Sequence, residues 1–303
     1  MTDAPPIDHP ITDASTTIRF MVDSRVAVVA NALSVDVEDY YHASLLGPVA
    51  PRARWDAFPA RVDGMTRRVL DMLAETEARA TFFVLGCVAA RHPDLVRAIV
   101  AGGHELASHG ALHYRVTEQS PQAFRRDVAD TRKLLEDLGG VPVLGYRAPS
   151  FSIDRDTWWA FQELTEAGYR YSSSINPIRH DHYGVPDAPR FPFDPIEGFR
   201  EIPVGTVDLF GQRWPCGGGG YFRLLPYALS CRAIGAVNRR EGKPVVFYFH
   251  PWEMDPGQPR LPVPSRRSRF RHYVNVGVME AKLRRLLDDF VWRRIDEVHP
   301  VKP

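Results

Sequence analysis

The stretch VAVVANALSVDVED, residues 26–39, decides the fold. Its first part, 26–35, is mostly apolar and rich in β-branched side chains, as expected for a strand buried on both faces. The run then ends in three acids, Asp36, Glu38 and Asp39. In parallel-sheet enzymes the catalytic groups follow the carboxyl ends of the strands. We therefore predict a buried strand over 26–35 with a functional acidic segment after it.

Strand and helix patterns alternate downstream of this stretch. The predicted strands cover residues 26–35, 80–85, 104–107, 143–146, 169–172 and 245–249. The predicted helices cover residues 61–77, 93–101, 120–138, 154–167, 226–240 and 278–293. Strand, helix and strand in steps of roughly 25–40 residues are typical of βαβ units. The fold class is therefore α/β, with a parallel sheet or barrel.

Three segments lack this alternation. Residues 1–20 are polar and Pro-rich, so we predict a disordered tail followed by a single domain over 21–303. Residues 176–220 are rich in Pro, Gly and aromatic residues with one strand-like stretch, 201–207, which predicts a long insertion that shapes a substrate surface. A Pro-rich loop is expected from the last strand to about residue 274.

The composition excludes several classes of protein. A formal net charge of +1 gives no reason to expect nucleic acid or an anionic membrane as partner. The chain has no run of 18 apolar residues and no secretion signal, so we expect no transmembrane segment and a cytoplasmic location. Its three cysteines, Cys87, Cys216 and Cys231, are far apart. This spacing favours reduced thiols over a disulfide framework or a cysteine zinc site.

The most specific local motif is His109-Gly-Ala-Leu-His113. Two histidines four residues apart bring their rings to one side of a helical turn or tight loop. Neutral imidazoles suit zinc, and also cobalt, nickel or ferrous iron. Because the chain contains 11 histidines, the pair alone is weak evidence.

Three other predicted strand ends carry polar residues. The acids of 36–39 repel one another unless a cation is present. Arg147 follows the strand 143–146, where it can pair with a carboxylate, and His250 follows 245–249 as either a satisfied core group or a general acid. Together these ends predict metal-assisted amide hydrolysis. A carboxylate and two imidazoles bind a divalent ion, a second carboxylate takes a proton from water, and an acid protonates the leaving amine.

Aromatic residues near the end of the chain are candidates for the substrate surface. Trp214, Tyr221, Phe222 and Trp252 can each stack on a sugar ring or belong to the core. The glycine run 217–220 lies among the first three of them, as either a flexible linker or a tight backbone turn over the sugar.

Taken together, these motifs resemble the polysaccharide deacetylase family, the NodB-like group also called carbohydrate esterase family four. The similarity runs from about Val26 to His250, and includes the framework segments Ala80–Phe83 and Gly103–His109. The resemblance implies a distorted (β/α) barrel of seven or eight strands. It also implies a metal-dependent hydrolase that removes N-acetyl groups from a polysaccharide, with zinc as the expected metal.

The resemblance further implies roles for single residues. Asp36 is the general base, Arg147 orients it, and His250 is the general acid. The implied metal ligands are Asp39, His109 and His113, with Glu38 as the alternative because the acids are spread as Asp-Val-Glu-Asp. Ser150 stands where the family usually has tyrosine, and its backbone N–H can still polarise the oxyanion. The aspartate that often positions the acidic histidine falls near Ser172, so that support is lost or supplied elsewhere.

Three stretches, 36–41, 217–222 and 249–253, resemble a narrower subgroup associated with exosortase and extracellular-polysaccharide loci. This subgroup carries an extra C-terminal region, here about 175–303. It implies a role in bacterial exopolysaccharide biosynthesis, with an N-acetylated glycan or a lipid-linked saccharide as substrate. Two other functions stay open: hydrolysis of a small cyclic amide or ureide on the same fold, and catalytically silent glycan binding.

Overall fold

The computed structural model describes residues 29–181 and 183–301. The predicted tail, 1–20, and the first residues of the strand predicted from 26 lie outside the described residues. The main sheet contains β1 Asn31–Val37, β2 Thr81–Val84, β3 Glu105–Ser108, β4 Gly145–Tyr146, β5 Tyr171–Ser172, β6 Phe193–Ile196, β7 Phe199–Glu201, β10 Val246–Phe249 and β11 Trp292–Arg293. A separate hairpin consists of β8 Thr206–Leu209 and β9 Gln212–Pro215.

The sheet follows the order β10-β1-β2-β3-β4-β5-β7-β6, with β11 also paired to β1. All pairs from β10 to β7 are parallel, and only β6 runs antiparallel to its neighbour. Within the described ranges no pairing joins β10 to β6, so the strands form a curled half-barrel rather than a closed one. The prediction of an α/β fold with a distorted barrel is confirmed in this form.

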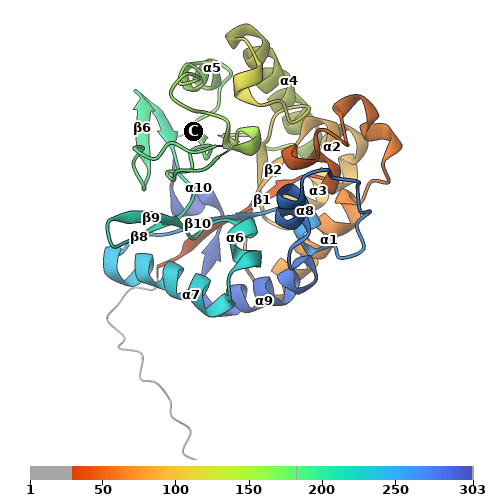
Figure 1. Ribbon diagram of the computed structural model, residues 1–303. Coiled ribbons are helices and arrows are strands. Elements are labelled where there is room, and N and C mark those ends of the chain that lie inside the picture. The colour runs from red at the N-terminus through yellow and green to blue at the C-terminus, as the bar shows by residue number, and fades with distance from the viewer. Residues whose placement is uncertain (1–28, 182, 302–303) are drawn as a thin grey trace, which may run out of the picture.

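Helices surround the curled sheet (Figure 1). They are α1 Val62–Glu75, α2 Gly86–Arg91, α3 Pro93–Ala101, α4 Pro121–Gly139, α5 Ala160–Glu166, α6 Gly219–Leu224, α7 Tyr227–Ala236, α8 Arg266–Tyr273, α9 Met279–Asp289 and α10 Ile295–Val298. The longest, α4, begins with Ser120 as N-cap and Pro121 at the first position, and ends at Gly140 in the left-handed conformation. The same serine, proline and glycine residues were the basis for predicting this helix from the sequence.

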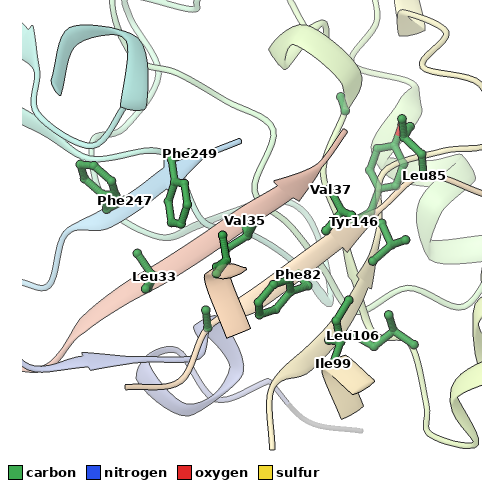
Figure 2. Packing of buried hydrophobic residues seen from close by; sticks show 14 of the residues in the cluster. Leu33, Val35, Val37, Phe82, Leu85, Ile99, Leu106, Tyr146, Phe247 and Phe249 are labelled. Carbon is green, nitrogen blue, oxygen red and sulfur yellow. The ribbon is translucent and has the colours of Figure 1, made fainter. Parts of the chain in front are cut away.

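Side chains alternate between the two faces of each strand, because the side-chain period of a strand is two. On β1, Leu33, Val35 and Val37 pack in the large cluster between sheet and helices, together with Phe82 and Phe249 (Figure 2). The other face points into the half-barrel, where a smaller cluster forms. Its members are Ala32, Phe83, Ala107, Tyr171, Ile202, Val246 and Ile295. The outer face therefore binds the helices, and the inner face is left for the site.

The same alternation selects the residues that enter the half-barrel past the strand ends. Ala32 of β1 faces inward, so Asp36 and Glu38 follow at inward positions. On β3 the inward residue Ala107 is followed by His109, and on β10 the inward residue Val246 is followed by His250. The polar residues that the sequence placed at strand ends thus share one side of the sheet because they share strand parity.

The C-terminal half departs from the prediction in four places. The helix predicted over 278–293 ends at Asp289, and residues 292–293 form β11 instead. The segment 176–220 is not an insertion outside the sheet, because β7 and β6 extend the main sheet and β8 and β9 form the hairpin. The expected loop before 274 contains α8, which Ser265 caps but whose sequence, RRSRFRHY, lacks an apolar period. The helix predicted over 154–167 covers only 160–166, since Thr157 and Asp154 form a side-chain turn instead.

Candidate active site

Three buried side chains converge beyond β1 and β3. Oε1 of Glu38 lies 2.9 Å from Nε2 of His109 and 3.0 Å from Nε2 of His113. All three residues are at most 4% exposed, and their ligand atoms lie within 4.8 Å of one another. One carboxylate and two imidazoles form a set of ligands that suits a divalent transition metal. These residues could therefore hold a metal ion.

The hydrogen bonds of His109 support this assignment. Its Nδ1 lies 2.8 Å from the backbone carbonyl of Arg147, which can only accept, so Nδ1 carries the proton. In the neutral ring Nε2 then presents a lone pair to the Glu38 carboxylate, which is also an acceptor. Two facing acceptors need a cation between them, either a proton on the ring or a metal ion. A backbone carbonyl on the other ring nitrogen is the usual support of a metal-binding histidine.

Electrostatics favour a charged Glu38. Burial alone would raise the pKa of this carboxyl, but the charge of His113 and hydrogen bonds from His109 and His113 hold it well below its usual range. Glu38 is therefore an anion although its side chain is almost fully buried. An anion of this kind requires a cationic partner.

Asp39 does not join this cluster, although the sequence favoured it as the ligand over Glu38. Its carboxylate accepts hydrogen bonds from the backbone N–H groups of Tyr40 (3.0 Å), Arg61 (2.7 Å) and Val62 (3.0 Å). It thereby caps the short helix η1 Tyr40–His42 and ties the segment to the start of α1. The geometry favours the alternative, Glu38, because inward strand parity continues to position 38 and not to 39.

Asp36 forms a buried ion pair next to the cluster. Oδ1 of Asp36 lies 2.7 Å from a terminal nitrogen of Arg147, and both side chains are at most 3% exposed. The same nitrogen donates to Oγ of Ser34 at 2.8 Å. The rest of the guanidinium donates to the carbonyl and hydroxyl oxygens of Ser173, both at 2.9 Å, and lies over the ring of Phe83. Arg147 is thus fixed on all sides, and among residues 29–181 and 183–301 none donates a hydrogen bond to the second oxygen of Asp36.

His250 lies opposite this second oxygen. Its Nε2 is 3.9 Å from Oδ2 of Asp36 and 3.9 Å from Oε1 of Glu38, and its side chain is 19% exposed. Burial would lower the pKa of His250, but the carboxylates of Glu253, Glu38 and Asp36 outweigh it and raise the pKa to about 9. The ring is therefore placed to act as a proton donor at the solvent-facing edge of the site.

Strained backbone marks the same region. His113, Ser150 and Phe151 are non-glycine residues with φ of 52°, 55° and 50°. Such residues cost free energy and tend to cluster at functional sites. Ser150 lies in the short helix η5 Pro149–Phe151, and its hydroxyl is 2.7 Å from that of Ser44.

The predicted stacking residues separate into buried and exposed groups. Trp252 is only 7% exposed, and its ring stacks on His250 and His272 at centroid distances of 5.2 and 4.3 Å. It supports His250 and presents no free face to a sugar, which corrects its predicted role. Trp214 is 53% exposed on the β8–β9 hairpin, and Tyr221 is half-buried on α6.

The glycine run follows neither of the two interpretations made from the sequence. Gly218 forms a β-bridge with Tyr248 of β10, and the N–H of Tyr248 donates to the carbonyl of Gly217 at 2.8 Å. A Cβ on Gly217 would overlap the carbonyl of Val246, and one on Gly219 would overlap the Glu253 carboxylate. The run is therefore a close contact between α6 and β10.

Three residues that hold the site in place were not predicted from the sequence. Ser34 and Ser173 fix Arg147, and Arg52 donates to the backbone carbonyls of Leu112 (3.0 Å) and His113 (2.8 Å). Arg52 thereby secures the loop that carries His113 in its positive-φ conformation. Ser34 could have been found, because a serine at an inward position of a buried strand needs a partner. No signal in the sequence points to Arg52 or Ser173.

Comparison with family models divides the chain into two parts. Residues 54–172 match the model described as polysaccharide deacetylase. The chain contains a polysaccharide deacetylase domain. Residues 173–300 match a second model, described as a domain of unknown function. The candidate site spans more than the matched deacetylase segment, since Asp36 and Glu38 precede it and His250 lies in the second part.

Individual relatives agree with this assignment over part of the chain. A peptidoglycan-N-acetylglucosamine deacetylase of Bacillus cereus is 33% identical over 105 residues, which cover 35% of this chain and 47% of the relative. A chitooligosaccharide deacetylase of Rhizobium leguminosarum bv. trifolii is 41% identical over 70 residues, which cover 23% of this chain and 33% of the relative. The chain thus spans less than half the length of these two relatives.

A solved structure extends the likeness of fold to nearly the whole chain. The crystal structure from Mycobacterium smegmatis of a protein assigned to the polysaccharide deacetylases has a TM-score of 0.56 and 21% identity. The match covers 96% of this chain and 91% of that one. The fold shared with that structure therefore includes the C-terminal segment, 173–300.

Two predictions from composition are also answered within the described residues. The three cysteines are free, so no disulfide joins them. Among the described helices, none combines the length and apolar character that a membrane crossing requires.

Proposed function

We propose that this protein hydrolyses the N-acetyl group of an N-acetylated polysaccharide or oligosaccharide with the help of a divalent metal ion. The observation that carries the proposal is the buried cluster of Glu38, His109 and His113 beside the Asp36–Arg147 ion pair. The deacetylase model matched by 54–172 and the named activities of the two relatives support the substrate class.

The metal would be held by Glu38, His109 and His113, and would polarise the acetyl carbonyl and lower the pKa of bound water. Zinc fits this set of one oxygen and two nitrogen ligands, as do cobalt, nickel and ferrous iron. The fit rests on the donor set itself, in which the lone pair of His109 faces the Glu38 carboxylate.

The chain's own residues divide the proton transfers between two sides of the site. Oδ2 of Asp36 accepts the proton of the attacking water, while Oδ1 stays bound to Arg147. Nε2 of His250, on the opposite side, donates a proton to the nitrogen as the C–N bond breaks. Water thus adds to the acyl carbon, and the products are acetate and a free amine. The backbone N–H of Ser150 is the proposed donor to the oxyanion.

The biological setting is a narrower proposal. The subgroup resemblance of 36–41, 217–222 and 249–253 supports a role in exopolysaccharide biosynthesis, with a lipid-linked saccharide as a possible form of the substrate. Trp214 and Tyr221 are the aromatic residues that stay accessible for sugar stacking.

The test combines metal analysis with an acetate-release assay. Purified protein is analysed for bound metal, stripped with chelator, reloaded with single metals, and incubated with N-acetylglucosamine oligomers and with allantoin. Acetate release that requires the metal supports the proposal. Turnover of allantoin alone, or oligomer binding without acetate release at any metal, would contradict it and favour the cyclic amidohydrolase or the silent glycan-binding protein.

A further inference from the structure

Glu253 contacts the side of His250 that faces away from the site. It lies in the short helix η7 Pro251–Met254, directly after His250, and is 2% exposed. Its Oε2 accepts the backbone N–H of His250 at 3.3 Å, and its Oε1 lies 3.7 Å from Nδ1 of the ring. The ring thus has carboxylates at both nitrogens, with Asp36 and Glu38 at Nε2 and Glu253 at Nδ1.

Arg223 holds this carboxylate in place from α6. Its side chain is 2% exposed, and its Nε lies 3.3 Å from Oε1 of Glu253. The terminal nitrogens donate to three backbone carbonyls of the segment 271–274, those of His272 (2.8 Å), Val274 (2.7 Å) and Arg271 (3.1 Å). A guanidinium fixed by three carbonyls cannot follow a moving side chain, so it anchors Glu253.

Packing leaves the pair little freedom. Gly219 lies against the Glu253 carboxylate so closely that a Cβ there would overlap it. Trp252 covers one face of the His250 ring, with an interplanar angle of 25°. In the described part of the chain, neither Nδ1 of His250 nor Nε of Arg223 has a hydrogen-bond partner. Both are within ion-pair distance of Glu253, which is therefore positioned to satisfy both buried groups.

We infer that Glu253, anchored by Arg223, is a positioning residue that keeps the proton on Nδ1 of His250 and its Nε2 directed at the substrate nitrogen. A carboxylate accepts only, so Nδ1 of the ring keeps its proton, and the second proton, which the ring takes up and passes on, is carried by Nε2. This inference rests on the proposed function. It also gives the segment 173–300, matched by the domain of unknown function, a task in the reaction besides supplying His250. In the family that the chain resembles, an aspartate that falls near Ser172 often positions the acidic histidine, and Glu253 would supply that support here.

The test is Glu253→Gln in the full-length, metal-loaded protein. We expect kcat to fall roughly 10–100-fold, which is typical for loss of such an orienting partner, with KM and metal content unchanged. In a His250→Ala background the same substitution should cause no further loss, because Glu253 acts only through that ring. Glu253→Asp should recover part of kcat. The matched control is Glu105→Gln, a buried glutamate at the opposite end of the strands, which should leave kcat unchanged.

Equal losses in the presence and absence of His250 would overturn the inference, because they would make Glu253 merely structural. A second readout does not depend on turnover: the ¹⁵N shifts of the His250 ring should report Nδ1 protonation in the wild type and its loss in Glu253→Gln. Unchanged ring shifts would also overturn the inference. A wild-type protein that releases no acetate but shows the expected shifts would refute the proposed function and leave the positioning role standing.

Discussion

Replacing Asp36 with asparagine separates the proposed base from the metal ligands. The substitution keeps the size of the side chain and an oxygen that can accept from Arg147, but it removes the negative charge. Asparagine cannot take a proton from water, so acetate release should fall about 10²–10⁴-fold, the usual contribution of a general base. Glu38, His109 and His113 are untouched, so the bound metal should stay at the wild-type level.

The same change leaves the Arg147 guanidinium buried without a counter-charge. Breaking a buried pair in this way costs about 3–5 kcal/mol, and the retained hydrogen bonds to Ser34 and Ser173 place the expected loss near the lower limit. A loss of about 3 kcal/mol corresponds to a fall in Tm of roughly 6–12 °C for a domain of this size.

Three measurements check this prediction on one preparation: metal content by elemental analysis, acetate release below the Tm, and thermal unfolding. The control is Asp137→Asn, a change on the exposed face of α4, which should alter none of them. A variant that keeps more than a tenth of the wild-type rate would show that another group is the base. Loss of metal together with activity would place Asp36 among the ligands and refute the division of roles.

Three other perturbations test separate parts of the molecule. His113→Ala should remove bound metal and activity together, as measured by elemental analysis and acetate release, and a variant that keeps its metal would exclude His113 as a ligand. The protonated His250 ring is the proposed donor, and nearby carboxylates raise its pKa to about 9. A cation bound to Glu38 would offset part of this rise, so activity should fall as the pH increases through a value at or below about 9. A pH–rate profile that is flat in this range would contradict the role of His250. Burial raises the pKa of Glu105 to about 8 from 4.5, so the folded protein keeps a proton that the unfolded chain releases. Stability should therefore fall between about pH 4.5 and 8, and Tm measured across this range should decline less in Glu105→Gln.

The N-terminal half of the fold could be predicted because local signals and tertiary structure agree there. Pro93, Pro121 and the terminal glycines mark helix ends, and apolar runs mark the strands. After residue 172 the sheet is extended by short strands whose pairing depends on distant partners. The three-residue strand β7 becomes a strand through β5 and β6, not through its own composition.

The sequence predicted which residues form the site better than it predicted the role of each one. Most of the predicted site residues lie at or after the ends of strands, which a sequence can reveal. Asp36 lies near the end of β1, and Arg147, His109, His113 and His250 come after strands. The choice between Glu38 and Asp39 depends on where the strand ends: β1 continues to Val37, two residues beyond the prediction. Because β1 ends at Val37, the carboxylate of Glu38 points inward and that of Asp39 caps the next helical turn.

The central place of β1 has a consequence for how the protein is made. Its neighbour β10 pairs with it from Ala32 to Val246, about 210 residues later. At ribosomal rates of roughly 5–20 residues per second, that partner emerges roughly 10–40 s after β1. Glu38, His109 and His113 are synthesised long before His250, so a nascent chain can present metal ligands before its acid exists. The nascent chain should therefore become able to hydrolyse its substrate only after β10 has paired with β1.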